Sequence, residues 1–353
     1  MRYYRLMGRN TLPIVWCLGA AALFGASTPA SKAVLASMHP VTLAGLLYLG
    51  AAIGVLPFSF RGGSWRLARR RRHIVRLMGA VFFGGILGPV LLLLGLSLAP
   101  AASVSLWLNL ESVATALLAW AFFKEHLGPR TWIAAGLVFV AGVILASPSS
   151  FGLGTAALLV ALACLSWGID NNLEATIDGL TPAQVTLAKG TVAGLVNLAL
   201  GLALEGPIGD PRLIPIALAL GALGYGLSIV LYVSGAQKLG AARSQMLFAT
   251  SPFLGTVIAW TALAESVQVV QIVAALVIAA GLALMLSERH EHSHSHDAVV
   301  HTHDHTHDDE HHDHVHESLP LQARHTHEHS HGADRHSHPH MPDLHHRHGH
   351  RSS

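Results

Sequence analysis

Long apolar runs separated by short polar breaks fill the first 287 residues of the chain. A helix needs about 20 apolar residues to cross about 30 Å of hydrocarbon. Ten runs approach that length, so the pattern predicts an all-α membrane protein with about ten transmembrane helices. The runs cover residues 12–35, 41–60, 74–97, 101–123, 131–147, 153–175, 183–204, 213–235, 241–263 and 268–287.

The composition supports this interpretation and excludes several functional classes. Hydrophobic residues make up 52% of the 353 residues and charged residues 12%, about half of what a soluble protein needs to cover its surface. The net charge of +2 gives no case for nucleic-acid binding. The sequence has no phosphate-binding loop of the G-x-x-x-x-G-K-[ST] type and no paired nucleophile and base, so we expect neither ATP-driven transport nor an enzyme.

Basic residues predict the orientation in the membrane. With the N-terminus inside, the cytoplasmic segments hold Arg2, Arg5 and Arg9 and the arginine-rich stretch 61–76, whereas the outer loops hold only Lys32 and Arg212. This asymmetry follows the positive-inside rule. We therefore expect a multi-pass protein of the cell inner membrane with both termini in the cytoplasm. The first run is too long for the apolar core of a secretory signal, so we interpret it as a transmembrane helix.

The two halves of the apolar region resemble each other. A shift of 140 places Ala101-Ala102 on Ala241-Ala242 and Trp120 on Trp260. Because each half has five spans, an odd number, the second copy crosses the membrane in the opposite sense, as in transporters built from inverted repeats. We expect a cytoplasmic N-terminus at 1–11, repeats at 12–147 and 148–287, and a tail at 288–353.

The end of the first half carries a family pattern. The stretch from Phe122 to Gly136, followed by Ala141-Gly142, resembles the end of an EamA-type repeat of the drug/metabolite transporter superfamily. In that pattern an acidic residue, here Glu125, ends a helix and is followed by a turn and a glycine-rich last span. The second copy is similar from Trp260 to Glu265 and at Ala280-Gly281.

Other family features are matched in one half. Trp167-Gly168 matches a Trp-Gly pair in the first helix of a repeat, while the first half has Phe24-Gly25. Lys189 lies seven residues after Pro182, where the family commonly has a basic residue; Leu47 departs from this pattern after Pro40. The resemblance covers about residues 12–287 and implies ten spans and secondary transport of a small solute, whose identity it leaves open.

Ionisable residues inside the spans are candidates for substrate binding or ion coupling, because charge is costly in hydrocarbon. Glu111 lies near the middle of the fourth run, two residues after Asn109, and its counterpart in the second half is Ser251. The fold therefore does not require this carboxylate. We interpret Glu111 as a coupling group that faces a central cavity, with pairing to a neighbouring helix as the alternative.

A second polar group lies near the end of the sixth run. Asp170 and Glu174 are four residues apart, on one helix face, and Asn171 and Asn172 lie between them. They can offer oxygens to a cation or form a solvated helix end. Lys189 is either an intramembrane partner of one carboxylate or a side chain that reaches the interface. Glu125 and Glu265 end equivalent helices, and we interpret them as helix-end residues rather than ligands.

The tail is rich in histidine, with 23 of the 26 histidines after Ser287. It has too few apolar residues to fold alone, so we expect it to be disordered. Alternating histidines interspersed with acids favour binding of Zn²⁺, Ni²⁺ or Co²⁺, while the transmembrane region requires no cofactor. The predicted metal ligands are His292, His294, His296, His301, His303, His305, His307, His311, His312, His314, His316, His325, His327, His329 and His331.

Three hypotheses follow. The first is a secondary transporter of divalent transition-metal ions that the tail collects. The second is an exporter of amino acids or other small metabolites, with the tail as a metal buffer or sensor. The third is a membrane-anchored metal store, which does not need ten spans. The spans lack a His or Cys cluster, which weakens the first hypothesis. A homodimer in the bilayer is left open.

Overall fold

The computed structural model describes most of the chain. The described residues are 2–60, 71–123, 127–146, 151–177, 180–239, 241–286, 290–296, 299–305, 325–331 and 334–340. They form two units, the helical region and residues 289–342 of the tail, which we treat separately.

The helical region confirms the predicted all-α membrane fold. Eight helices or continuous helical runs of the described chain are long and apolar enough to cross a membrane. The pair α12–α13 and the shorter α14 complete ten spans. The first five spans are α1 (Arg2–Val34), α2 (Pro40–Ser59), α3–η1–α4 (Arg71–Ala80, Val81–Leu87, Gly88–Leu98), α5–α6 (Ala101–Trp107, Leu110–Phe123) and α7 (Pro129–Ala146). The second five are α8 (Phe151–Glu174), α9 (Pro182–Leu204), η2–α10–η3–α11 (Pro211–Leu213, Ile214–Gly221, Ala222–Leu227, Ser228–Leu239), α12–α13 (Ala241–Phe248, Ser251–Ala262) and α14 (Val269–Leu286).

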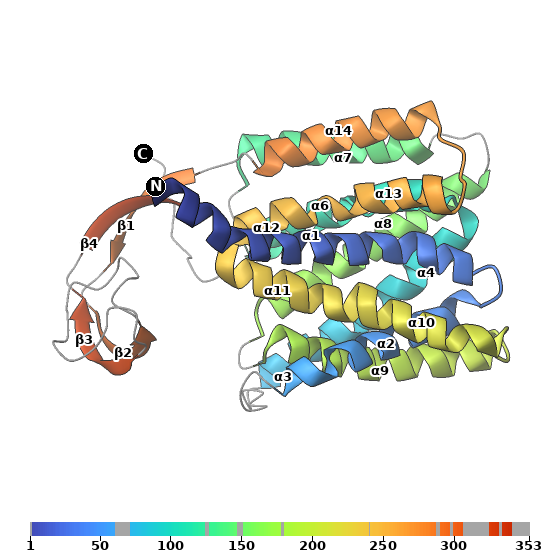
Figure 1. Ribbon diagram of the computed structural model, residues 1–353, viewed down its shortest axis with the longest axis horizontal. Coiled ribbons are helices and arrows are strands. Elements are labelled where there is room, and N and C mark those ends of the chain that lie inside the picture. Colours follow the sequence, from blue (N-terminus) through green and yellow to red (C-terminus); the bar gives the residue numbers. More distant parts are fainter. Residues whose placement is uncertain are drawn as a thin grey trace. The chain divides into compact units, whose positions relative to one another are not determined.

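The helices pack in pairs taken from the two halves. Figure 1 shows α7 beside α14 at one edge of the bundle and α2 beside α9 at the opposite edge. Helix α1 packs on α11 and α13, and its counterpart α8 packs in the same way on α4 and α6. Each contact between halves is therefore repeated with the roles exchanged, as two inverted five-helix copies require.

The interruptions of the spans are repeated as well. The π-helical segment η1 lies inside the third span, and η3 lies 141 residues later inside the eighth. The fourth span breaks between Trp107 and Leu110, and the ninth breaks between Phe248 and Ser251. The apolar runs predict both pairs of spans but not these breaks.

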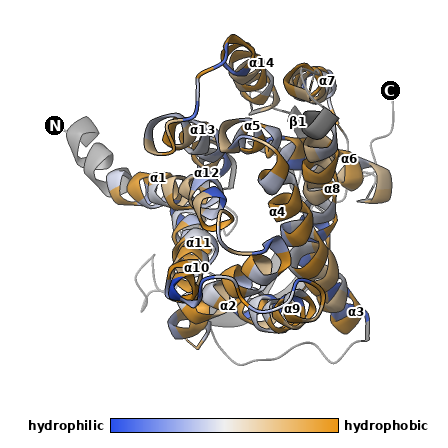
Figure 2. Cartoon of the chain, turned by 90° about the vertical axis from the view of Figure 1, so that its right-hand side faces the viewer, coloured by the Kyte–Doolittle hydropathy of each residue, from blue (hydrophilic) through white to orange (hydrophobic). Residues whose placement is uncertain are grey.

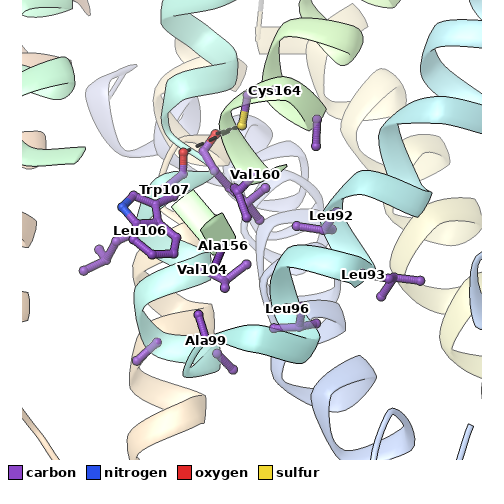
Figure 3. Close-up of a cluster of buried hydrophobic side chains, with 14 of the residues drawn as sticks. Leu92, Leu93, Leu96, Ala99, Val104, Leu106, Trp107, Ala156, Val160 and Cys164 are labelled. Carbon is purple, nitrogen blue, oxygen red and sulfur yellow. Dashed lines mark hydrogen bonds between the residues drawn. The ribbon is translucent and has the colours of Figure 1, made fainter. Parts of the chain in front are cut away.

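Hydrophobic side chains fill the interfaces between helices and also cover the outside of the bundle. The largest buried cluster includes Trp107, Leu106, Leu93 and Leu96, with Val160 of α8 against them (Figure 3). Viewed end on, the helices are mostly coloured as hydrophobic, whereas the loop between α13 and α14 is hydrophilic (Figure 2). An apolar surface of this kind is what a lipid solvent requires.

The crossing of α2 and α9 depends on glycine. A Cβ at Gly45 would lie against the backbone of Leu198, and one at Gly194 would lie 2.8 Å from the backbone nitrogen of Leu49. Small residues let the two helix backbones approach this closely. The crossing sets the positions of Tyr48 on α2 and Lys189 on α9.

The described part of the tail contains four strands that pair as two antiparallel ladders. Strand β1 (His290–His296) pairs with β4 (Asp334–His340), and β2 (Val299–His305) pairs with β3 (His325–His331). The prediction of a disordered tail did not foresee these strands. A separate two-stranded ladder is at best marginally stable in water, in keeping with a segment that has too few apolar residues to fold alone.

Candidate transport site

Lys189 lies between two carboxylates. The ammonium nitrogen Nζ of Lys189, on α9, lies 2.6 Å from Asp170 Oδ2 and 2.6 Å from Glu174 Oε1, both on α8. Asp170 and Glu174 lie on one face of α8 because they are one helical turn apart. The side chains of Lys189 and Asp170 are 12% and 4% exposed, and that of Glu174 is 32% exposed. Lys189 is thus a partner of both carboxylates inside the bundle, rather than of one or of neither.

Asp170 keeps one oxygen free. Within the described part of the chain, its buried Oδ1 has no hydrogen-bond partner. A buried carboxylate oxygen without a partner carries a desolvation cost. This oxygen therefore favours binding a proton or a donor group supplied from outside the protein.

Glu111 lies at the same helix interface. Asn171 on α8 donates a hydrogen bond from Nδ2 to Glu111 Oε1 at 2.9 Å, and the same nitrogen lies 3.3 Å from Thr115 Oγ1. The next residue, Asn172, donates to the carbonyls of Thr115 and Gly168. The two asparagines thus join α8 to α6 and hold Glu111 beside the helix that carries Asp170.

Asn109 has a local role. Its side-chain nitrogen donates to the Leu106 carbonyl at 2.9 Å, at the break between α5 and α6. The Cys164 thiol lies 3.7 Å from the Trp107 carbonyl at the same break (Figure 3). These contacts supply hydrogen-bond donors to carbonyl groups that lack a backbone donor because the helix is broken there. The structure brings together Glu111 and Asn171 on one side, and Asp170, Glu174 and Lys189 on the other, but places Asn109 with the helix break.

The π-helical segment η1 forms the wall behind Asp170. The carbonyl of Gly84 accepts hydrogen bonds from Trp167 Nε1 at 3.0 Å and from the Tyr48 hydroxyl. Asn197 Nδ2 donates to the Gly85 carbonyl at 3.0 Å. A π segment widens the helix and misaligns its carbonyls. The side chains of Trp167, Tyr48 and Asn197 donate hydrogen bonds to two of these carbonyls. Sequence reasoning missed Tyr48 and Asn197, although an amide inside an apolar span is a signal that could have revealed Asn197.

Aromatic rings lie on the side of the second half. Phe24 of α1 contacts Tyr225 of η3 and Phe248 of α12, with ring centroids 5.8 and 5.4 Å apart. Tyr225 also lies 6.0 Å from Tyr48, which bonds to the η1 wall. The charged groups thus adjoin an aromatic surface built from α1, α2, η3 and α12.

Three charged side chains bind the ends of helices: Glu265 and Lys32 where α5 begins and α4 ends, and Glu205 where α2 begins. Glu265 accepts hydrogen bonds from the backbone N–H groups of Ala101 and Ala102, at 2.7 and 2.9 Å. Glu205 does the same for Val41 and Thr42 at the start of α2. At the N-terminus of a helix, a carboxylate accepts hydrogen bonds from the free backbone N–H groups, and its negative charge interacts favourably with the helix dipole. Lys32 Nζ lies 2.7 Å from the Leu96 carbonyl at the end of α4.

Replacing Glu265 with alanine is expected to lower the free energy of unfolding by about 1–2 kcal/mol, the usual cost of losing a helix N-terminal cap. The preceding Ala264 has φ 51°, a strained conformation for a residue with a Cβ. The measurement is thermal unfolding in detergent, with Asp210→Asn in the loop before α10 as the control. An unchanged melting temperature would contradict the capping role. The equivalent Glu125 lies outside the described residues.

The predicted metal ligands are covered only in part. The backbones of ten of the fifteen predicted histidines lie in β1, β2 and β3, while His307, His311, His312, His314 and His316 lie outside the described residues. Among the described side chains, no group of three or more His, Cys, Asp or Glu has a geometry that could hold a metal ion.

Comparison with known proteins finds similar sequences and a solved structure with a similar fold. A protein described as an uncharacterized transporter, from Methanothermobacter thermautotrophicus, is 25% identical over 290 residues, or 75% of this chain and 83% of that protein. A riboflavin transporter from Rhizobium johnstonii is 32% identical over 108 residues, which cover 29% of this chain and 36% of that protein. A solved structure described only as "Crystal structure of protein" has the same fold, with a TM-score of 0.56, 17% identity, and 78% of this chain and 96% of the other covered.

The family model for EamA-like transporters matches the chain twice. The matches run over residues 11–147 and 154–287. Together they cover nearly all of the helical region that contains Lys189, Asp170, Glu174 and Glu111. The chain is therefore a membrane transporter of the EamA-like family.

Proposed function

We propose that this protein is a secondary transporter of a small organic ampholyte, such as an amino acid, which it exchanges for protons. The proposal rests on the position of Lys189 between Asp170 and Glu174, with Glu111 held nearby by its hydrogen bond from Asn171. Such a group offers a cation and several carboxylates to a solute that carries both charges. The adjoining rings of Phe24, Tyr48 and Tyr225 provide an apolar wall for the rest of the solute.

The charges of the site support exchange with protons. The site holds one ammonium, paired with two carboxylates, and the third carboxylate of Glu111 on the neighbouring helix, so two negative charges among these four groups are not neutralised when all are ionised. Uncompensated charge inside a membrane protein is costly. Either a proton or the amino group of a solute can offset part of it, so the two compete for the same carboxylates. This competition is the basis of exchange.

The same arrangement favours an organic solute over a metal ion. The ammonium of Lys189 already occupies the space between Asp170 and Glu174, and a divalent ion there would meet it at close range. Transition-metal ions also favour imidazole and thiolate ligands, and the described side chains around Lys189 supply carboxylates and amides. Transport of metal ions collected by the tail remains the competing hypothesis, supported by the tail's histidines.

The membrane setting is part of the proposal. Inverted repeats permit alternating access, in which one half rocks against the other around a fixed site. The positive-inside asymmetry supports an inner-membrane protein with both termini in the cytoplasm. In a membrane whose proton gradient is directed inward, exchange of the solute for protons drives export. Alkaline phosphatase fused after Ser353 should be inactive, and fused after Arg212 it should be active; the reverse pattern would contradict this orientation.

The test is solute-evoked proton flux in proteoliposomes with a pH dye trapped inside. Each of the twenty amino acids is added separately, and Zn²⁺, Ni²⁺ and Co²⁺ are added in parallel. The proposal expects at least one amino acid to move protons and the metal ions to move none. Proton flux evoked by the metals alone would support the competing hypothesis.

Replacing Glu111 with glutamine should abolish solute-evoked proton flux while leaving the protein folded. Glutamine retains an oxygen that can accept the hydrogen bond from Asn171 Nδ2, but it cannot exchange a proton. The measurement is the same flux assay, with the melting temperature as a check on folding. Asp210→Asn, an acid-to-amide change in an outlying turn, should keep its flux. Full proton flux with Glu111→Gln would remove Glu111 from the coupling role.

A further inference from the structure

The two ladders of the tail place histidine opposite histidine. In the pairing of β1 with β4, His290 lies opposite His340, His292 opposite His338 and His294 opposite His336. In the pairing of β2 with β3, the histidine pairs are 301 with 329, 303 with 327 and 305 with 325. Six cross-strand histidine pairs therefore occupy register positions two residues apart within each strand.

This register separates the residue types by face. Residues directly opposite each other, and residues two apart on one strand, share one face of a ladder. The positions between the histidines pair Ser293 with Ser337 and Thr302 with Glu328, on the other face. A slip by one residue would place histidines opposite residues of this other face, such as Ser337 or Glu328, instead.

We propose that each ladder is a transition-metal site whose ligands come from both strands. Residues directly opposite have Cβ atoms about 4.5–5.5 Å apart, a spacing suited to two imidazoles on one ion. Two adjacent pairs supply four nitrogen ligands, the number that tetrahedral Zn²⁺ takes. Ni²⁺ and Co²⁺ bind the same ligand type.

Metal binding also explains how such short ladders hold together. A two-stranded ladder without a core is marginal in water, and few of these residues are apolar. When a metal site exists only in the folded form, the free energy of binding contributes to folding. The bound ion thus fixes the register and joins segment 290–305 to segment 325–340, which lie on either side of residues 306–324.

The first experiment titrates Zn²⁺ into the full-length protein in nanodiscs, in competition with a chelating dye. One variant replaces His290, His292 and His294 with serine, a second replaces His336, His338 and His340, and a third replaces all six. Because each site uses both strands, either triple variant should weaken the same Zn²⁺ sites by on the order of 10-fold or more, as ligand loss costs at least as much as losing an outer-shell partner. The sixfold variant should lose little more than either triple.

A matched control replaces three histidines from the stretch of sequence between β2 and β3, His311, His312 and His314, with serine. It should retain the tight sites. Losses that add in the sixfold variant would mean that each strand binds metal by itself, and they would overturn the proposal. So would a control that weakens Zn²⁺ binding as much as the β4 variant, since only the number of histidines would then matter.

The second experiment reads the register directly. Cysteines at Ser293 and Ser337, which lie opposite each other in β1 and β4, carry spin labels, while the native Cys17 and Cys164 are buried. Adding Zn²⁺ should narrow the distance distribution to that of directly opposed residues, and a chelator should reverse the change. A distribution that Zn²⁺ leaves unchanged would contradict a cross-strand site. Neither experiment depends on transport activity.

Discussion

Replacing Lys189 with glutamine is expected to abolish transport and to lower the free energy of unfolding by about 3–5 kcal/mol, the usual cost of removing one partner of a buried ion pair. The ammonium lies 2.6 Å from both Asp170 and Glu174, and only 4% of the Asp170 side chain is exposed. Without Lys189, Asp170 would keep a negative charge among helices with no cation beside it. The measurement is thermal unfolding in detergent together with the flux assay.

A second variant separates folding from function. Neutralising Lys189 and its more buried partner, in Asp170→Asn with Lys189→Gln, removes the uncompensated charge of Asp170 and leaves only the more exposed Glu174 without its cation, so the variant should recover much of the stability. Transport should not recover, because the solute and the proton would lose their binding groups. A stable double variant with full transport would contradict the site. A Lys189→Gln variant as stable as the parent would show that the ion pair contributes little in the bilayer.

The spans were predictable from the sequence because the bilayer sets their length. A run of about 20 apolar residues has to be helical in lipid, and the ten predicted runs fall on the ten spans. The breaks inside the spans were not predictable. The π form of η1 depends on donors from three other helices, Tyr48, Trp167 and Asn197, that hydrogen-bond to its carbonyls. The apolar run that contains η1 does not indicate which side chains of other helices will hydrogen-bond to its carbonyls.

The candidate site was predictable where it depends on one helix. The spacing of Asp170 and Glu174 places them on one face of α8, and Lys189 was among their possible partners. The contact between Asn171 and Glu111 depends instead on how α8 is rotated against α6. That rotation follows from packing across the whole interface. The position of Gly84 against Asp170 also depends on packing between helices, because Gly84 lies in the first half of the chain and Asp170 in the second.

Replacing Gly84 with alanine is therefore expected to disturb the site from the side of η1. A Cβ at this position would overlap the carboxylate of Asp170, with Oδ1 2.6 Å away. Either the carboxylate moves away from Lys189 or η1 moves away from α8, and both changes disrupt the geometry of the ion pair. Overpacking of this kind costs about 1–3 kcal/mol. We expect a lower melting temperature and a loss of most solute-evoked proton flux.

The matched control is Gly136→Ala in α7. A Cβ at Gly136 would meet nothing within 4 Å, and alanine in a helix interior is favoured over glycine by about 0.5–1 kcal/mol. This variant should be as stable as the parent or more so, with full flux. Normal transport by Gly84→Ala would mean that Asp170 can move without loss of function. In that case the ion pair with Lys189 would serve the packing of α8 on α9 rather than the binding of solute and protons.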